Sequence, residues 1–254
     1  MSITKNQPRI GNFTSSEIAA LMTKGKKKGE LGKPAYTYIK EKVMERRLQR
    51  SLDTETNARP LTWGQLIEKH VFELLGLEYQ LVSQESIVHP EISCWAGSPD
   101  ANKFDEGKTV VDIKSPITLK SFCQLVDPLY VGKTGLETIM EIRKNHSSGE
   151  DYYWQLVSNA VLTNSKFAEL IVYVPYFSEL EKIRAFASEA DLENPHRYYW
   201  INNAVDEELP YILDNGFYKN INVIRFEIPE EDKVALTERV IYSATVLSIE
   251  NNEN

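Results

Sequence analysis

Residues 96–116 read AGSPDANKFDEGKTVVDIKSP, and this stretch decides the fold. Its second half, Thr109–Lys114, is rich in β-branched residues and predicts a strand. The preceding Asp105-Glu106-Gly107 predicts a turn, so that the chain reverses direction just before this strand. The strand nevertheless carries an aspartate and a lysine two positions apart, twelve residues after another aspartate. Charged residues in the most strand-prone run of the chain require an explanation.

Side chains alternate between the two faces of a strand, so the predicted strand has two chemically different sides. Val111 and Ile113 share one face, whereas Val110, Asp112 and Lys114 share the other. We expect the first face to join the core and the second to present an acid and a base side by side. A surface ion pair on an edge strand is the alternative, although Val110 interrupts the polar pattern that such a strand would show.

Helical and strand-like periodicities alternate along the rest of the chain. They predict helices over 13–22, 35–48, 61–76, 136–144, 151–163 and 230–247, and strands over 86–88, 92–96, 168–176 and 222–227. The Ser and Thr residues that open 13–22 predict a capped helix there. This order of elements predicts an α/β fold with a central mixed β-sheet flanked by helices.

Composition limits the class of protein. The 254 residues carry a formal net charge of −8, which excludes a surface coated with basic charge but allows one basic groove on an acidic body. Residues 24–47 hold nine Lys and Arg against three Glu, and form either a surface for a polyanion or a solvated helix and loop. Cys94 and Cys123 are too few for a disulfide framework, and no basic leader or apolar run of about 18 residues is present. We therefore expect a soluble cytoplasmic protein without membrane contact.

The helix predicted over 61–76 turns one carboxylate toward apolar neighbours. At about 100° per residue, Leu75 lies about 20° and Phe72 about 40° from Glu68 around the helix. A carboxylate on an apolar face is unfavourable unless another group compensates its charge. Glu68 is therefore either part of a charged site or an edge residue that reaches water.

Glu68, Asp100, Asp112 and Lys114 together make a candidate metal site, although Asp100 after a proline would by itself indicate only a turn. Mg²⁺ takes one or two carboxylates together with water and substrate phosphate. Such an ion would keep the carboxylates ionised, lower the pKa of a bound water and polarise a phosphodiester. Lys114 would position or deprotonate the attacking water and offset the charge on the phosphorus. We expect Mg²⁺, with Mn²⁺ as a substitute.

Several motifs together resemble one family of nucleases. Pro99-Asp100 followed by Asp112-Ile113-Lys114 resembles the PD-(D/E)xK nuclease signature. Four further stretches are similar, in order and spacing, to segments of the phage lambda exonuclease family, also called YqaJ-like viral recombinases: RIGNFTSSEI (9–18), WGQLIEKH (63–70), GSPDA (97–101) with VDIKSP (111–116), and YYWQLVSNAVL (152–162). The resemblance covers residues 9–176. It implies one nuclease domain over 1–254, in which 177–254 is an extension to which no residue role is carried over.

The resemblance implies a Mg²⁺-dependent exonuclease that degrades one strand of linear double-stranded DNA from a 5′ end, for recombination by single-strand annealing. It also implies an annealing protein as partner, a homo-oligomer in the form of a ring-shaped trimer, and a phage or prophage gene expressed in the cytoplasm of a bacterial host. By motif position, Lys114 is the catalytic lysine, and the metal ligands are Glu68, Asp100, Asp112 and the backbone carbonyl of Ile113. The positions that match contacts to the 5′-phosphate and the DNA are Arg9, Ser16, Ser98 and Gln155.

Some positions depart from that pattern. Asp112 stands where the family usually has glutamate, and Ala101 replaces a common glycine. Residues 122–151 are longer than usual and are expected to form a DNA-contacting loop or a partner surface. Two other functions stay open, a restriction-type endonuclease on the same fold and a catalytically inert DNA-binding subunit. Cleavage of closed circular DNA would indicate the first, and a lack of metal binding would favour the second.

Overall fold

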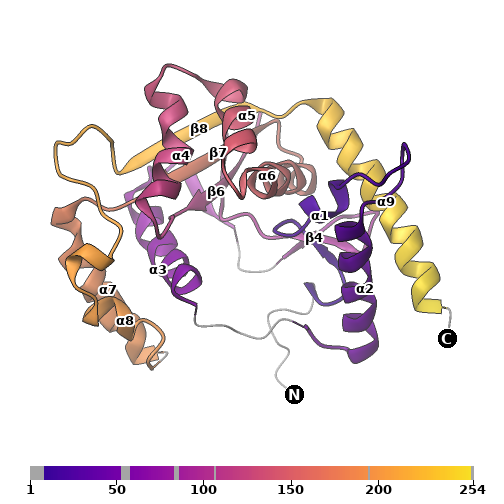
Figure 1. Ribbon diagram of the computed structural model, residues 1–254, viewed down its shortest axis with the longest axis horizontal. Helices are drawn as coiled ribbons and strands as arrows, with labels where there is room; N and C mark the ends of the chain where they lie inside the picture. Colours follow the sequence, from indigo (N-terminus) through magenta and orange to yellow (C-terminus); the bar gives the residue numbers. More distant parts are fainter. Residues whose placement is uncertain (1–8, 53–57, 83–85, 106, 194, 253–254) are drawn as a thin grey trace.

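A computed structural model describes residues 9–52, 58–82, 86–105, 107–193 and 195–252 (Figure 1). Its strands are β1 (Phe13–Thr14), β2 (Tyr79–Leu81), β3 (Ile87–Val88), β4 (Trp95–Gly97), β5 (Ala101–Lys103), β6 (Thr109–Lys114), β7 (Phe167–Tyr173) and β8 (Ile221–Glu227). Its α-helices are α1 (Ala19–Met22), α2 (Lys33–Leu48), α3 (Arg59–Leu74), α4 (Leu119–Tyr130), α5 (Gly135–Asn145), α6 (Gly149–Thr163), α7 (Leu180–Glu193), α8 (Tyr199–Asn203) and α9 (Glu230–Asn252).

Five strands form the main sheet in the order β2-β5-β6-β7-β8. β6 and β7 run parallel, and the other neighbouring strands are antiparallel. A parallel pair requires a crossover connection, which here contains α4, α5 and α6. The structure is therefore a mixed sheet flanked by helices, and the fold class predicted from the sequence is confirmed.

β6 is a central strand of the main sheet, with β5 on one side and β7 on the other, and helices cover both faces of the sheet. Val110 packs into one apolar cluster with side chains of α2, α4, α5, α6 and α9. Val111 and Ile113 pack into a second cluster with side chains of α3, α7 and α8. Asp112 is fully buried on the same face as Val110. The alternative of a surface ion pair on an edge strand is therefore wrong, because β6 has a neighbour on each side and a helical layer over each face.

A smaller sheet has the strand order β1-β4-β3 and alternates with the main sheet along the chain, because β2 of the main sheet precedes β3. β1 pairs in parallel with β4, and β4 ends at Gly97. A Cβ atom at Gly97 would lie 2.1 Å from Ser15 Oγ and 2.6 Å from Asn159 Oδ1. Only glycine therefore allows β4, α6 and the end of β1 to approach this closely. β5 of the main sheet begins at Ala101, so the short link from Gly97 to Ala101 joins β4 of the smaller sheet to β5 of the main sheet.

The C-terminal third of the chain lies on both sides of the molecule. Figure 1 shows α3, α7 and α8 on one side and α1, α2 and α9 on the other, with β6 and α6 between them. α7 packs on α3, whereas α9 packs on α2 and α6. The helix predicted over 230–247 corresponds to α9, and the sequence did not predict α7 or α8.

The structure corrects two local expectations. Residues 13–22 are not one capped helix, because β1 and α1 divide them. The Phe13 N–H donates to the Cys94 carbonyl at 2.7 Å, so pairing with the small sheet replaces the first helical turns. Residues 122–151 are not a loop, because they run from within α4 through α5 into α6. Of the helices within the described ranges, none is both long enough and apolar enough to cross a membrane.

Candidate active site

Asp100 fills a gap along the edge of β6. The pairing of β5 with β6 ends where Ala101 faces Val111, and Pro99, two residues earlier, has no N–H to extend it. Beyond that point, the Ile113 N–H donates to Asp100 Oδ2 at 2.6 Å. Because the N–H and C=O of one strand residue point to the same side, the Ile113 carbonyl also faces this edge. Two of the groups expected to bind a metal therefore lie at the same place.

Gln155 of α6 joins Asp112 and Lys114 on β6. Lys114 Nζ is 2.7 Å from Asp112 Oδ2 and donates to Gln155 Oε1 at 3.2 Å. Gln155 Nε2 donates to Asp112 Oδ1 at 2.9 Å, across a sequence separation of 43 residues. The ring of Tyr152, about one turn earlier on α6, has its centroid 5.1 Å from Lys114 Nζ. These contacts orient the acid and the ammonium relative to each other.

Glu68 of α3 brings a third carboxylate to this end of β6. Burial, together with the charge of Asp112, raises the pKa of Glu68. Burial and the charges of Asp112 and Glu68 raise the pKa of Asp100 well above its ordinary value. Burial by itself would lower the pKa of Lys114, but the charges of Asp112 and Asp100 more than offset it, so that pKa is raised. Three carboxylates thus share one ammonium, and the site is short of positive charge.

The carboxylate and carbonyl oxygens of this site are the ligands that a hard divalent cation prefers. In this structure, however, the carboxylates are not grouped around a single point. Asp112 Oδ2 is buried and has no hydrogen-bond partner among the described residues, and its short contact with Lys114 is an ion pair only. The described ranges contain no group of three or more His, Cys, Asp or Glu side chains arranged to hold a metal ion. One oxygen of Asp112 faces the Lys114 ammonium, and one oxygen of Asp100 accepts the hydrogen bond from the Ile113 N–H. An ion would supply the missing positive charge.

The other expected site residues lie around the small sheet, with one exception. Arg9 Nη2 donates to Ser16 Oγ at 3.3 Å, and both side chains are exposed. Ser98 Oγ lies 2.9 Å from Ser86 Oγ. Since β1 and β4 run parallel, Ser16 and Ser98 both follow the same end of that sheet. The exception is Gln155, which contacts the acid and the lysine of β6.

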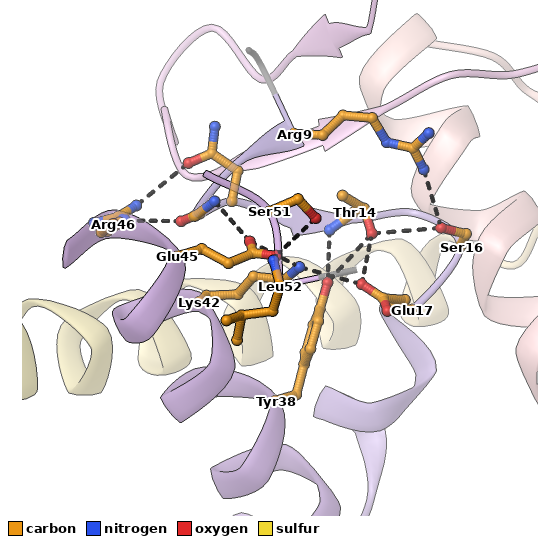
Figure 2. Close-up of polar contacts among 12 residues, drawn as sticks. Arg9, Thr14, Ser16, Glu17, Tyr38, Lys42, Glu45, Arg46, Ser51 and Leu52 are labelled. Atoms are coloured by element: carbon orange, nitrogen blue, oxygen red, sulfur yellow. Dashed lines mark hydrogen bonds and ion pairs between the residues drawn. The ribbon is translucent and has the colours of Figure 1, made fainter. Parts of the chain in front are cut away.

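A buried carboxylate on α2 holds the turn that follows Arg9 (Figure 2). Glu45 Oε2 accepts hydrogen bonds from the Gly11 N–H at 2.8 Å and from Lys42 Nζ at 3.2 Å. Arg46 Nε donates to the Gly11 carbonyl at 2.7 Å. Gly11 has a φ of 68°, and a Cβ atom there would lie 2.4 Å from Arg46 Cγ. This close approach and left-handed conformation require glycine, and they fix where the chain leaves Arg9.

Sequence reasoning missed Tyr152, Glu45 and Arg46. Tyr152 stands in a stretch that resembles the family's glutamine helix, but nothing local indicates that its ring faces Lys114. Glu45 looks like a solvent-facing residue of a highly charged helix, and its burial depends on a turn 34 residues earlier. The one local signal was the basic character of residues 24–47, which does not distinguish a buried residue from an exposed one.

The fold and this arrangement define a class of protein. A central strand with an Asp-x-Lys sequence, an aspartate at its edge and a glutamate from a neighbouring helix are the features of PD-(D/E)xK nuclease folds. No family model matches the sequence, and neither does any curated protein.

Solved structures of exonucleases share this fold. One is LHK-Exo in complex with dAMP, with a TM-score of 0.60 and 15% identity over 98% of this chain and 94% of that one. Another, the alkaline exonuclease LHK-Exo from Laribacter hongkongensis, has a TM-score of 0.58 and 17% identity over 96% and 91% of the two chains. A phage-related exonuclease from Haemophilus somnus has a TM-score of 0.59 and 12% identity over 94% and 96%. The chain therefore has the fold of exonucleases, as the motifs predicted.

Proposed function

We propose that this protein is a metal-dependent deoxyribonuclease, and specifically an exonuclease that degrades one strand of linear double-stranded DNA from a 5′ end. The observation that carries the proposal is the meeting of Asp100, Asp112 and Glu68 with Lys114 at the end of β6. The likeness to solved exonucleases, one of them in complex with dAMP, supports the same reaction class.

The proposal extends to the biological setting. The activity uses Mg²⁺, with Mn²⁺ as a substitute, and prepares single strands for an annealing protein during phage-type recombination in the bacterial cytoplasm. The protein acts as a ring-shaped homotrimer, and residues 1–254 form one domain. The motif resemblance supports the setting and the trimer. The assignment of one domain is supported by β6, because this strand contributes side chains to both apolar clusters.

Each residue of the site has a part in the proposed reaction. A divalent ion held by Glu68, Asp100, Asp112 and the Ile113 carbonyl would supply a water of lowered pKa and polarise the scissile phosphate. The ammonium of Lys114 lies beside this ligand set, where it donates to the attacking water and offsets charge on the phosphorus.

Two further groups orient the reactants. Gln155 binds both Asp112 and Lys114 and so fixes their relative positions. The Asp112 carboxylate and the Lys114 ammonium therefore face the phosphate together. Arg9 offers a planar guanidinium to the terminal 5′-phosphate, with the Ser16 hydroxyl beside it.

A lysine substitution tests the proposal. Lys114→Ala should slow the Mg²⁺-dependent digestion of an end-labelled linear duplex by at least about a hundredfold, because it removes a charge that acts on the transition state. Lys166→Ala is the matched control, because Lys166 is exposed and pairs with Glu227 at the opposite end of β7. Equal digestion by wild type and Lys114→Ala would refute the assignment.

The substrate separates the remaining functions. An exonuclease leaves closed circular duplex intact, whereas a restriction-type endonuclease linearises it. Labels at the 5′ and 3′ ends report the polarity, and duplexes with and without a 5′-phosphate report the role of Arg9. Calorimetric titration that detects neither Mg²⁺ nor Mn²⁺ binding would support a catalytically inert DNA-binding subunit instead.

A further inference from the structure

Part of the α3 surface beside Glu68 is open. At about 100° per residue, Leu61, Gly64 and Gln65 lie within about 60° of Glu68 around the helix axis. Leu61 is 44% exposed, and a Cβ atom at Gly64 would meet no atom from the rest of the described chain within 4 Å, apart from its own helix. We call Leu61, Gly64 and Gln65 the open strip of α3. It leads along the helix toward the carboxylate that the proposed function places on the metal.

The C-terminal extension supplies a cation beside this strip. Arg197, which precedes α8, donates from Nη2 to Gln65 Oε1 at 2.6 Å across 132 residues of sequence. Gln65 stands about 4.5 Å along the helix axis before Glu68, so the residue that Arg197 contacts lies within one helical turn of the proposed metal ligand. Nothing in the motif resemblance assigned a role to this part of the chain.

The charge of Arg197 is not neutralised within the described part of the chain. None of the carboxylates there forms an ion pair with it. Its Nε is buried and has no hydrogen-bond partner among the described residues. A guanidinium that no carboxylate pairs with keeps its positive charge available to an anion such as a phosphate.

Packing holds Arg197 in this position. The next residue, Tyr198, is buried, and its N–H donates to Asp191 Oδ1 at 2.6 Å. Trp200 Nε1 donates to Thr62 Oγ1 of α3 at 2.9 Å, which ties α8 directly to the helix that carries the open strip. The guanidinium is therefore presented at a fixed place, as a preorganised phosphate contact requires.

We infer that the open strip of α3 and Arg197 bind the sugar-phosphate backbone of the DNA strand next to the cleavage site. The inference rests on the proposed function for the identity of the ligand. The glycine lets the backbone approach the helix, and the guanidinium binds a phosphate while Gln65 orients it. α7 and α8, which the sequence left without a role, thus place a DNA contact beside the catalytic acids.

The salt dependence of DNA binding tests the inference. A fluorescein-labelled 20-base-pair duplex is titrated with each protein in EDTA at several salt concentrations, with anisotropy as the readout. Arg197→Gln should weaken binding about tenfold and reduce the slope of log K against log salt by about 1, the effect of one lost phosphate contact. Arg197→Lys should keep the slope of the wild type, because the positive charge remains.

Lys182→Gln is the matched control. Lys182 is exposed on α7 near His70, which points about 160° away from Glu68 around α3, so this variant loses the same charge on another side. It should leave the slope unchanged. If Arg197→Gln lowers the thermal midpoint, Gln65→Glu replaces it, because a carboxylate beside the guanidinium masks its charge without removing the side chain. An unchanged slope in a folded Arg197→Gln or Gln65→Glu protein, or an equal change in Lys182→Gln, overturns the inference.

Digestion of the same duplex with Mg²⁺ separates the two proposals. Digestion by the wild type together with an unchanged slope in Arg197→Gln removes this DNA contact and leaves the nuclease function in place. A reduced slope together with no digestion by the wild type keeps the DNA contact and removes the nuclease function.

Discussion

Replacing Asp100 with asparagine should stabilise the metal-free protein and remove its response to Mg²⁺. The pKa of Asp100 is raised by burial and by the charges of Asp112 and Glu68, although the Lys114 ammonium and the Ile113 N–H act in the opposite direction. The ionised form is therefore unfavourable in the folded state. Asparagine has nearly the same shape and keeps an oxygen for the Ile113 N–H, but it carries no charge.

The expected gain follows from two opposing effects. Each unit by which folding raises the pKa of an acid lowers the free energy of unfolding by about 1.4 kcal/mol at a pH above both values. Against this, the hydrogen bond from Ile113 weakens by about 1 kcal/mol when its acceptor becomes neutral. Because three carboxylates share one ammonium at this site, we expect the first effect to exceed the second, and a net gain of about 1 kcal/mol would raise the thermal midpoint by about 2 to 4 °C.

The pH dependence has a definite sign. A folded-state pKa above the unfolded value means that the folded protein binds more protons, so wild-type stability falls as the pH rises from about 4 through the raised value. The advantage of Asp100→Asn should therefore be larger at pH 8 than at pH 5 and vanish below about pH 4. Thermal unfolding in EDTA across this range measures it.

Asp105→Asn is the matched control on the same hairpin. Burial acts to raise the pKa of Asp105, but hydrogen bonds from Arg225 and Thr109 lower it by more, so the net pKa is lowered and the charged form is favourable in the folded protein. Asp105→Asn should therefore lower the thermal midpoint at pH 8, where Asp100→Asn raises it. Adding Mg²⁺ should raise the midpoint of wild type and have little effect on Asp100→Asn. A lower midpoint for metal-free Asp100→Asn at pH 8 would refute the reasoning.

Three further outcomes are expected. Gly97→Ala places a methyl group 2.1 Å from Ser15 Oγ and should destabilise the protein by about 1 to 3 kcal/mol. An unchanged unfolding midpoint would contradict the close packing of β4 against Ser15 and α6. Glu45→Gln weakens the hydrogen bond from the Gly11 N–H that holds the turn after Arg9. Initial digestion rates should show that the preference for 5′-phosphorylated over 5′-hydroxyl duplex ends falls by a factor of about 3 to 10. A preference equal to that of wild type would show that the turn needs no charged acceptor. Protons compete with a metal ion for the carboxylates of Glu68 and Asp100, whose pKa values are raised. Mg²⁺ should therefore raise the thermal midpoint more at pH 8 than at pH 5, and equal shifts would argue against carboxylate ligands.

The sequence by itself determined the elements that carry the acids. The strand over Thr109–Lys114 has the bounds that its β-branched residues predict, and α3 and α6 lie where helical periodicity places them. It also placed Asp112 and Lys114 side by side, because alternation along a strand is a local property. The period of one helix also placed Glu68 among apolar neighbours, and burial indeed raises the pKa of its carboxyl.

Only the tertiary structure decided which distant residues contact one another around the candidate site. Gln155 reaches Asp112 across 43 residues, and Arg197 reaches Gln65 across 132. The short strand β1 and the buried Glu45 also depend on partners far along the chain. The physical reason is that periodicity records which face of an element is buried, whereas its partner depends on how all the buried faces pack together.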